Sequence, residues 1–536
     1  RLRQAVEKTD LTDGQKDAVL TGLTGAGRFR GVQGYAGAGK TFMLDALRGF
    51  AEKAGYTVEG AAPTNRAVEQ LSEAIPASTT TAMLRINAAN GKLGDKSKSI
   101  LVIDEAAMVS TADMRDIMAA ANRANYARVI LVGDVKQLDA VSAGSPFAQL
   151  QKAGLPTALM ADIQRQRDET AKAAVLHAIK GEVKAAFDNI SRIRTPAQSE
   201  TFPSAVAQSW LALRHAERDK TGVVVLTNEV RQKVNAEIRA TLKDERSIGR
   251  EDVKQRSLQP LNFTRAEANE IASYKAGDVV VPLKDMKAEG LQKGLVYVVE
   301  GASDRSKTLI VRPEKGGEAL RVPIGKTPGA DPALVAYEQT ERDFAKGDRV
   351  KFAITDKDSG MANGARGTIE AIDQRQIRVT LQGGKTVTLP ADSMAARGMD
   401  HAYSATAHDF QGASVDRIIV GMSAAETLST QKAFYVNISR ARDSVTLVTT
   451  DPAKLADTIQ KNSGERPSAL DAYAQKQRDD AEAAKAAELQ KQQEAPSPAR
   501  TFQELDGVLQ HQAQKFAAMN KERETPDINA ALKEIE

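Results

Sequence analysis

Short runs of apolar, β-branched residues alternate with stretches of helical periodicity in the first third of the chain. Between Phe29 and Ala161 the apolar runs are FRGVQ, YTVEGAAP, SILVIDEA and RVILVGD, and the helical stretches include TFMLDALRGFAEKAG and TADMRDIMAAANRAN. Strands separated by helices of this length are typical of βα units, whose strands pair in parallel. The pattern therefore predicts an α/β domain over residues 1–165.

A second alternation of the same kind is interrupted. It begins with TGVVVLTNEV and a helical stretch near Arg231–Leu242, breaks off, and resumes with DRIIVGM, a helical stretch around Ser429–Arg442 and SVTLVTT. The two halves, residues 166–255 and 398–457, are predicted to form one α/β domain with a parallel sheet.

The interrupting segment, residues 256–397, is rich in glycine and alternating strand patterns and contains a repeat. AGDVVVPL, followed by GLVYVVEGASDRSKTLIVRPEKGGEALRVP, is echoed by KGDRVKFAI, followed by NGARGTIEAIDQRQIRVTLQGGKTVTLP. Each copy contains a Gly-Asp turn, then strands separated by polar and Gly-Gly turns, which fits a small barrel of the SH3 type. We therefore predict a duplicated β module, two SH3-like copies inserted into the second α/β domain.

The end of the chain changes composition again. Residues 458–500 are predicted to form a linker, because from Asp471 to Arg500 the chain has almost no large apolar residue. A helical C-terminal tail, residues 501–536, is predicted as an amphipathic helix that docks on the body or a partner, or frays. Its apolar residues at helical spacing are Phe502, Leu505, Leu509, Phe516 and Met519.

Length and composition bound the answer without naming a function. The chain has 536 residues, more than the ~250–300 residues of a single core, so at least two domains are expected. No apolar run approaches the ~18 residues of a membrane span, so no membrane insertion is predicted. The formal net charge of +4 does not argue for nucleic acid.

The absence of cysteine removes several kinds of site. With no cysteine in the chain, disulfide scaffolds, thiolate metal sites and cysteine nucleophiles are excluded, and five histidines leave little for a histidine metal cluster. Residue Arg1 is not a start methionine, and the first segment lacks the apolar core of a signal peptide. We therefore expect a cytoplasmic chain cut from a longer protein.

The strongest chemical motif is GYAGAGKT, which lies between an apolar run and a helical stretch. It matches the phosphate-binding P-loop, in which glycines let backbone N–H groups surround phosphate oxygens at a helix N-terminus. The lysine reaches the β and γ phosphates, and the hydroxyl holds Mg²⁺. The motif predicts an ATP and Mg²⁺ site whose cofactor-binding residues include Gly34, Gly37, Ala38, Gly39, Lys40 and Thr41.

Two carboxylates follow the apolar run SILVI. Because parallel strands deliver the residues after their carboxyl ends to the ligand edge of a sheet, we expect Asp104 and Glu105 there. Asp104 is the predicted metal ligand beside Thr41. Glu105 is the predicted base that polarises the attacking water beside the γ-phosphate.

Three further side chains are candidates for the same site. The run RVILVGD places Asp134 and Gln137 at the sheet edge, where Gln137 would hydrogen-bond the γ-phosphate or the water. Arg165 in DIQRQ and Arg440 in YVNISRAR are candidates to stabilise the charge that spreads over the phosphoryl oxygens. The predicted catalytic set is Lys40, Glu105, Gln137, Arg165 and Arg440.

The order of these motifs resembles that of a known family. The series LTDGQKDAV, GYAGAGKT, APTNRA, VIDEAAM, GDVKQL, IQRQ, SATAHDFQGAS and YVNISRAR, running from about Leu11 to Asp451, is similar to the motifs of superfamily 1 helicases of the RecD-like branch. Within that branch, VQGYAGAGKT and LTNEVRQKVNAEIR resemble the helicase domain of conjugative relaxase-helicases of the TraI/TrwC type. The resemblance implies two RecA-like P-loop NTPase domains.

The resemblance also implies roles by position. Gln15 would read the adenine, and Gly412 in the fifth motif would lie at the nucleotide cleft. The DNA-binding candidates are Thr64, Asn65, Arg66, Asn363, Gly364, Thr406 and His408. The sequence departs from the usual second motif at Ala107, where a serine is common, which puts the coupling of motifs in doubt rather than hydrolysis.

The residues themselves argue for DNA more weakly than for ATP. A strand-tracking groove needs basic residues and aromatic platforms, but only 4% of the residues are aromatic. Phe344, Tyr403 and Phe410 are candidate platforms, each more expected in the core. Nucleic acid therefore enters mainly through the resemblance.

The function predicted is an ATP-dependent single-stranded DNA translocase and helicase, 5′-to-3′, acting in conjugative plasmid transfer. The resemblance implies as partners an upstream relaxase domain of the same polypeptide, a coupling protein and a type IV secretion apparatus. Two alternatives stay open: a RecD-like DNA repair helicase, and a non-hydrolysing DNA-binding or secretion-recognition module.

Overall fold

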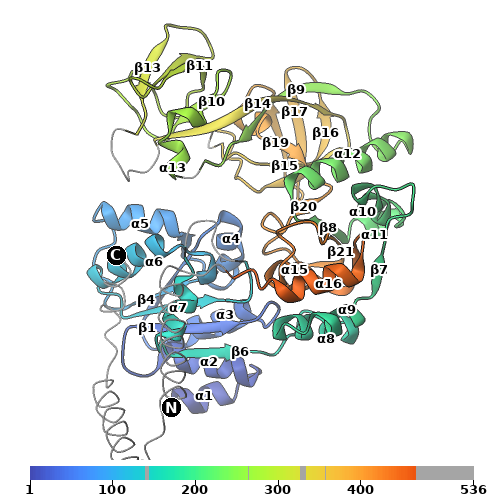
Figure 1. Ribbon diagram of the computed structural model, residues 1–536. Helices are drawn as coiled ribbons and strands as arrows, with labels where there is room; N and C mark the ends of the chain where they lie inside the picture. The colour runs from blue at the N-terminus through green and yellow to red at the C-terminus, as the bar shows by residue number, and fades with distance from the viewer. Residues whose placement is uncertain (139–143, 264, 326–332, 357, 466–536) are drawn as a thin grey trace, which may run out of the picture. The chain divides into compact units, whose positions relative to one another are not determined.

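The computed structural model describes residues 1–138, 144–263, 265–325, 333–356 and 358–465 (Figure 1). These residues form two compact units. Unit 1 comprises residues 1–195, 220–222 and those from 410 onward, and unit 2 comprises residues 196–219 and 223–409. Within the described ranges, no helix has the length and apolar character needed to cross a bilayer.

Unit 1 contains a six-stranded, all-parallel sheet with the order β3-β2-β4-β5-β1-β6. The four apolar runs of the first third of the sequence form β1, β2, β4 and β5, as predicted. The strands are β1 (Phe29–Gly34), β2 (Thr57–Ala62), β3 (Ser78–Thr80), β4 (Ser99–Ile103), β5 (Arg128–Gly133) and β6 (Thr157–Met160).

Helices cover both faces of this sheet (Figure 1). Because side chains alternate along a strand, Val102 packs in one core and its neighbour Leu101 in the other. The first core is completed by α1 (Leu2–Glu7), α2 (Asp13–Leu23), α3 (Lys40–Lys53) and α4 (Asn65–Ala74). The second contains η1 (Ala106–Met108), α5 (Thr81–Ala89), α6 (Thr111–Arg123) and α7 (Pro146–Lys152).

A second group of parallel strands in unit 1 consists of β7, β21 and β22, in which β22 pairs with both others. The start of β8 lies beside β21, where the Arg417 amide donates to the Lys220 carbonyl at 3.2 Å. The elements are β7 (Arg192–Arg194), β8 (Thr221–Val225), β21 (Val415–Gly421), β22 (Ala441–Val448), α8 (Glu169–Lys180), α9 (Val183–Asp188), α15 (Gln431–Ile438) and α16 (Pro452–Lys461). The mixed α/β class predicted from the sequence is confirmed.

Two predicted boundaries in this region are wrong. The helix expected over Ser429–Arg442 ends at Ile438, because Ser439 is its C-cap and β22 begins at Ala441. The predicted linker does not begin at 458, because α16 continues to Lys461 and buries Ile459. The rest of the linker, from residue 466, and the predicted helix over 501–536 lie outside the described residues.

Unit 2 contains two antiparallel sheets. Their orders are β13-β12-β11-β10-β14-β9 and β18-β17-β16-β15-β19. The strands are β9 (Val253–Pro260), β10 (Val279–Pro282), β11 (Tyr297–Ser303), β12 (Thr308–Pro313), β13 (Leu320–Pro323), β14 (Leu334–Phe344), β15 (Arg349–Phe352), β16 (Arg366–Ile372), β17 (Gln376–Leu381), β18 (Thr386–Pro390) and β19 (Met399–His401).

The repeat seen in the sequence has a counterpart in the strands. The meander β10-β11-β12-β13 of one sheet corresponds to β15-β16-β17-β18 of the other. The register shifts between Val299 and Gly301 in the first copy, and between Ile369 and Ala371 in the second. The inserted region is longer than the predicted 256–397, because β9 begins at Val253 and β19 continues to His401.

The remaining elements of unit 2 are helical apart from one short strand. They are α10 (Phe202–Leu211), α11 (His215–Arg218), α12 (Asn228–Asp244), α13 (Arg265–Ala268), η2 (Ile271–Ser273), α14 (Met394–Arg397) and β20 (Ala405–Thr406), which pairs in parallel with the end of β8.

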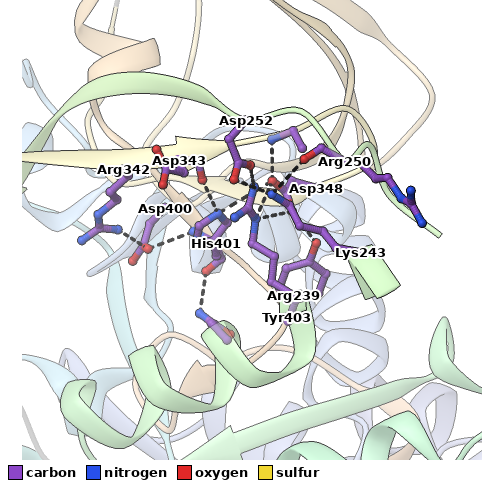
Figure 2. Close-up of polar contacts among 12 residues, drawn as sticks. Arg239, Lys243, Arg250, Asp252, Arg342, Asp343, Asp348, Asp400, His401 and Tyr403 are labelled. Atoms are coloured by element: carbon purple, nitrogen blue, oxygen red, sulfur yellow. Dashed lines mark hydrogen bonds and ion pairs between the residues drawn. The ribbon is translucent and has the colours of Figure 1, made fainter. Parts of the chain in front are cut away.

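One side of α12 lines a polar cavity of about 560 Å³, here called the α12 cavity (Figure 2). Its other walls are parts of β9, β14 and β19. Three cations line this cavity, and each forms ion pairs. Arg239 pairs with Asp348 and Asp252, Lys243 also pairs with Asp252, and Arg342 pairs with Asp400. The Asp348 carboxylate has no exposed surface and also accepts from the Tyr403 hydroxyl at 2.6 Å.

Candidate nucleotide site

The P-loop connects β1 to α3, as the motif predicts. Gly37 and Gly39 have φ angles of 85° and 75°, a region that side chains rarely adopt. A Cβ on Gly37 would lie 2.6 Å from the Cβ of Arg165, so neither the backbone nor the space admits a side chain there. The Lys40 ammonium donates to the Gly34 carbonyl at 2.9 Å and bridges the loop.

Asp104 and Glu105 follow β4 at the same end of the sheet. The Asp104 amide donates to the Ala61 carbonyl of β2 at 2.9 Å, which extends the sheet by one residue. Burial and the neighbouring Glu105 raise the pKa of Asp104 to about 7, although Lys40 opposes the shift. Glu105 has a φ of 50°, and such backbone strain clusters at functional sites.

The two predicted arginines and Gln137 lie in one group. The Arg440 guanidinium donates to the Gln137 side-chain oxygen at 2.9 Å, and Arg165 donates to the Ser439 carbonyl at 3.0 Å. Burial and nearby Arg440 lower the pKa of Arg165 to about 10, while burial lowers the pKa of Arg440 against the pull of Glu105. Arg440 is buried and Arg165 is partly buried, and each guanidinium hydrogen-bonds a neutral oxygen, an arrangement that suits an anionic ligand.

These residues line one cavity of about 620 Å³ within unit 1, here called the nucleotide cavity. It brings together predicted residues from six separate segments of the sequence. Its lining consists of Ala36, Gly37, Ala38, Gly39, Lys40, Thr41, Gln70, Glu73, Asp104, Glu105, Gln137, Gln164, Arg165, Arg167, Gly412, Ser414, Arg440 and Arg442.

The donor set of this cavity fits a hard divalent cation with a polyphosphate. Thr41 has an exposed side chain at the start of α3, and Asp104 lines the same cavity. Hydroxyl and carboxylate oxygens are the ligands that Mg²⁺ prefers. Because burial and Glu105 raise the pKa of Asp104 despite nearby Lys40, a bound cation would stabilise the ionised carboxylate. In addition, the Arg440 Nε is buried without a partner among the described residues.

Gln15 lies behind the P-loop rather than in the cavity lining. Its side-chain oxygen accepts from the Thr12 amide at 3.0 Å in a capping box, and its amide nitrogen donates to the Ala38 carbonyl at 3.1 Å. Gly34 also lies outside the lining, with its carbonyl on Lys40. Contact between Gln15 and adenine stays a prediction. The contact that the structure shows, with the Ala38 carbonyl, supports the P-loop.

The DNA-binding candidates lie in both units. In unit 1, Thr64 caps α4 by accepting from the Ala67 amide at 3.2 Å, and Asn65 and Arg66 begin that helix after β2. In unit 2, the Thr406 hydroxyl accepts from the Asp409 amide at 3.4 Å, and His408 is exposed. Asn363 and Gly364 lie in an exposed turn before β16, also in unit 2. Their proposed contact with DNA stays a prediction.

The three aromatic candidates for base stacking are buried. Phe344 has no exposed surface, and Tyr403 and Phe410 are each 6% exposed. Phe344 packs against the His401 ring, with ring centroids 4.8 Å apart. The arrangement agrees with the expectation that these rings belong to the core.

Sequence reasoning missed several residues around the nucleotide cavity. Gln164, Arg167, Ser414 and Arg442 line it, and each lies within two residues of a predicted motif residue. Adjacency to a motif was the signal that would have found them. The buried Tyr435, which contacts the P-loop, is the first residue of the motif YVNISRAR, but no role was predicted for it.

The chain is similar to several known proteins. A family model described as an AAA domain matches residues 10–195. The multifunctional conjugation protein TraI of Escherichia coli K12 is 25% identical over 519 residues, which cover 86% of this chain and 29% of TraI. The conjugal transfer protein TraA of Rhizobium radiobacter is 30% identical over 297 residues, which cover 55% of this chain and 26% of TraA.

The chain therefore spans less than a third of the length of these relatives. The ATP-dependent RecD2 DNA helicase of Deinococcus radiodurans is 33% identical over 172 residues, 31% of this chain and 23% of RecD2. A solved structure of Pif1 helicase from Bacteroides with ADP-AlF3 and ssDNA is 17% identical, with a TM-score of 0.48 and coverage of 84% of this chain and 94% of Pif1. The predicted resemblance to TraI-type conjugation proteins and RecD-like helicases is confirmed.

Proposed function

We propose that this chain is an ATP-dependent DNA helicase that translocates on single-stranded DNA during conjugative plasmid transfer. One observation carries the proposal: the P-loop, the Asp104–Glu105 pair, Gln137 and the arginines Arg165 and Arg440 line a single cavity. This donor set matches the parts that phosphoryl transfer requires. Similarity to TraI, TraA and RecD2 supports DNA as the partner and conjugation as the setting.

The residues divide the chemistry among themselves. The P-loop amides and Lys40 bind the phosphates, while Thr41 and Asp104 would hold Mg²⁺, which supplies charge neutralisation at the phosphate oxygens. Glu105 takes the proton of the attacking water. Gln137 orients that water, and Arg165 and Arg440 stabilise the negative charge that spreads over the γ-phosphoryl oxygens.

The finer architecture belongs to the same proposal. We assign residues 1–165 to one RecA-like domain and 166–252 with 402–457 to a second. The duplicated β sheets, inserted in the sequence of the second domain, are assigned to an SH3-like module. Motion along DNA is 5′-to-3′, driven by nucleotide turnover, in the cytoplasm. A relaxase domain of the same polypeptide, a coupling protein and a type IV secretion apparatus are the proposed partners.

Steady-state ATP hydrolysis with and without single-stranded DNA tests this function. We expect strong stimulation by DNA in the native chain, and a loss of about 100-fold or more in Glu105→Gln, which removes the base but keeps the shape. The matched control is Glu69→Gln, at an exposed carboxylate of α4. DNA binding without hydrolysis in the native chain would overturn the motor and leave a binding module.

A further inference from the structure

Tyr435 of α15 contacts the P-loop from the far end of the sequence. Its side chain is buried, with 1% of its surface exposed, and its hydroxyl accepts from the Ala36 amide at 2.7 Å. The same hydroxyl donates to the Asp134 carboxylate at 2.7 Å. Burial and the Asp134 charge raise the pKa of Tyr435 well above its ordinary value, so the hydroxyl keeps the proton that it donates. Phenylalanine could replace the ring but neither hydrogen bond.

Asp134 fixes the direction in which Gln137 presents its amide. The carboxylate has no exposed surface and accepts from Gln33 at 2.9 Å and from the Gln137 amide nitrogen at 3.1 Å. Because that nitrogen is engaged, the Gln137 oxygen points the other way and accepts from Arg440 at 2.9 Å. The orientation of one proposed catalytic side chain therefore depends on Asp134.

These contacts form one continuous hydrogen-bonded chain. It runs from the Ala36 amide through Tyr435, Asp134 and Gln137 to Arg440. Tyr435 lies within α15 and Arg440 directly follows the C-cap Ser439, so the two residues belong to one short segment of the chain. Buried polar networks of this kind hold their members in a single arrangement when every link is made.

We infer that Tyr435 is a positioning residue for ATP hydrolysis, acting through Asp134 to set the P-loop, Gln137 and Arg440 in register. The inference rests on the proposed function, because it assigns Tyr435 a part in the same reaction. It assigns Tyr435 no contact with the nucleotide, since Tyr435 does not line the nucleotide cavity. Losing the hydroxyl should therefore slow the chemical step more than it weakens nucleotide binding.

The test is Tyr435→Phe, measured by kcat and KM for ATP hydrolysis with saturating single-stranded DNA. A second readout is the Kd of a fluorescent non-hydrolysable ATP analogue. We expect kcat to fall about 10-fold or more, as misplaced catalytic groups do, with Kd changed less than about 2-fold. Asp134→Asn should lower kcat similarly, and the double variant should be no slower than the slower single variant, because both break one chain.

Tyr126→Phe is the matched control. Tyr126 is also fully buried in unit 1, and its hydroxyl donates to the Glu59 carboxylate at 2.7 Å, away from the nucleotide cavity. It should lose thermal stability without a change in kcat. Equal kcat in Tyr435→Phe and Tyr126→Phe would overturn the inference and leave the proposed function standing. Additive losses of kcat in the variant that combines Tyr435→Phe with Asp134→Asn would do the same. An inactive native chain would instead overturn the proposed function.

Discussion

The nucleotide cavity and the α12 cavity are two polar hollows of similar volume, about 620 and 560 Å³. In the α12 cavity the lining cations Arg239, Lys243 and Arg342 each have a carboxylate partner (Figure 2). In the nucleotide cavity, Arg167 and Arg442 also pair with Asp416, but Arg440 and Arg165 hydrogen-bond neutral oxygens instead. The two cavities therefore differ in the charge balance of these two arginines rather than in size.

This difference indicates that the charged side chains of the α12 cavity stabilise the fold, whereas those of the nucleotide cavity are arranged to bind a ligand. Buried ion pairs compensate each other's desolvation only when both partners are present. The nucleotide cavity keeps Asp104 beside Glu105 with a raised pKa, and holds Glu105 at a φ of 50°. Uncompensated charge and backbone strain in the same place are typical of functional sites.

The largest expected effect comes from comparing one lysine in each cavity. Lys40→Ala should lower DNA-stimulated ATP hydrolysis about 100-fold or more, because it removes the phosphate-binding ammonium. Lys243→Ala should leave the rate within about 2-fold, since Asp252 keeps Arg239 as a partner. Steady-state hydrolysis of both variants checks this. Similar losses in the two variants would remove the distinction between the cavities.

The second effect compares Asp348, which pairs with the lining Arg239 of the α12 cavity, with Asp104, which lines the nucleotide cavity. The expected changes in stability have opposite signs. Asp348→Asn should lower the free energy of unfolding of unit 2 by about 3 kcal/mol, because it removes one of the two carboxylates that pair with the Arg239 guanidinium. Asp104→Asn should raise thermal stability measured without divalent metal, because the raised pKa shows that the ionised carboxylate is unfavourable in the folded chain.

Fluorescence of Trp210 makes the Asp348 measurement specific. It is the single tryptophan of the chain, lies buried in α10 of unit 2, and has the Tyr403 ring 6.4 Å away. Its signal during denaturant unfolding therefore reports on the unit that contains Asp348. Unchanged unfolding in Asp348→Asn, or a loss of stability in Asp104→Asn, would contradict the assignment of the two carboxylates.

Most of the nucleotide cavity could be predicted from the sequence because its parts are local. The P-loop and the Asp104–Glu105 pair each lie within a few residues of the end of a strand, so the local sequence pattern and the motif are enough to identify them. The order of the parallel strands then places them at one edge. Lys40, Glu105 and Gln137, which were predicted to share one site, all line the nucleotide cavity.

What the sequence did not predict depends on contacts between distant residues. The link between Ala36 and Tyr435 joins positions 399 residues apart, and nothing in either local sequence signals it. The inserted region was predicted too short, because β9 is assigned by its pairing with β14 rather than by its own pattern. Likewise the charged helical stretch around Arg239 gave no sign of the α12 cavity, whose walls come from four elements.

The smallest expected effect is a pH dependence of unit 2 at His401. Burial lowers the pKa of His401 from its ordinary 6.5, although Asp348 and Asp400 oppose the shift and Arg239 and Arg342 add to it. Between that lowered pKa and 6.5, the unfolded chain therefore binds a proton that the folded chain does not. As the pH is lowered through this window, the free energy of unfolding decreases by at most about 1.4 kcal/mol per pH unit from this group.

His401→Gln should flatten that dependence between pH 7 and 5, followed by Trp210 fluorescence during denaturant unfolding. Asp400, which faces His401, stays ionised in this range, since Arg231 and Arg342 lower its pKa below the ordinary value although burial opposes that shift. The exposed His215 gives the control His215→Gln, whose slope should match that of the native chain. A steeper slope in His401→Gln would mean that the α12 cavity favours the charged imidazole, and that its charge balance is incomplete like that of the nucleotide cavity.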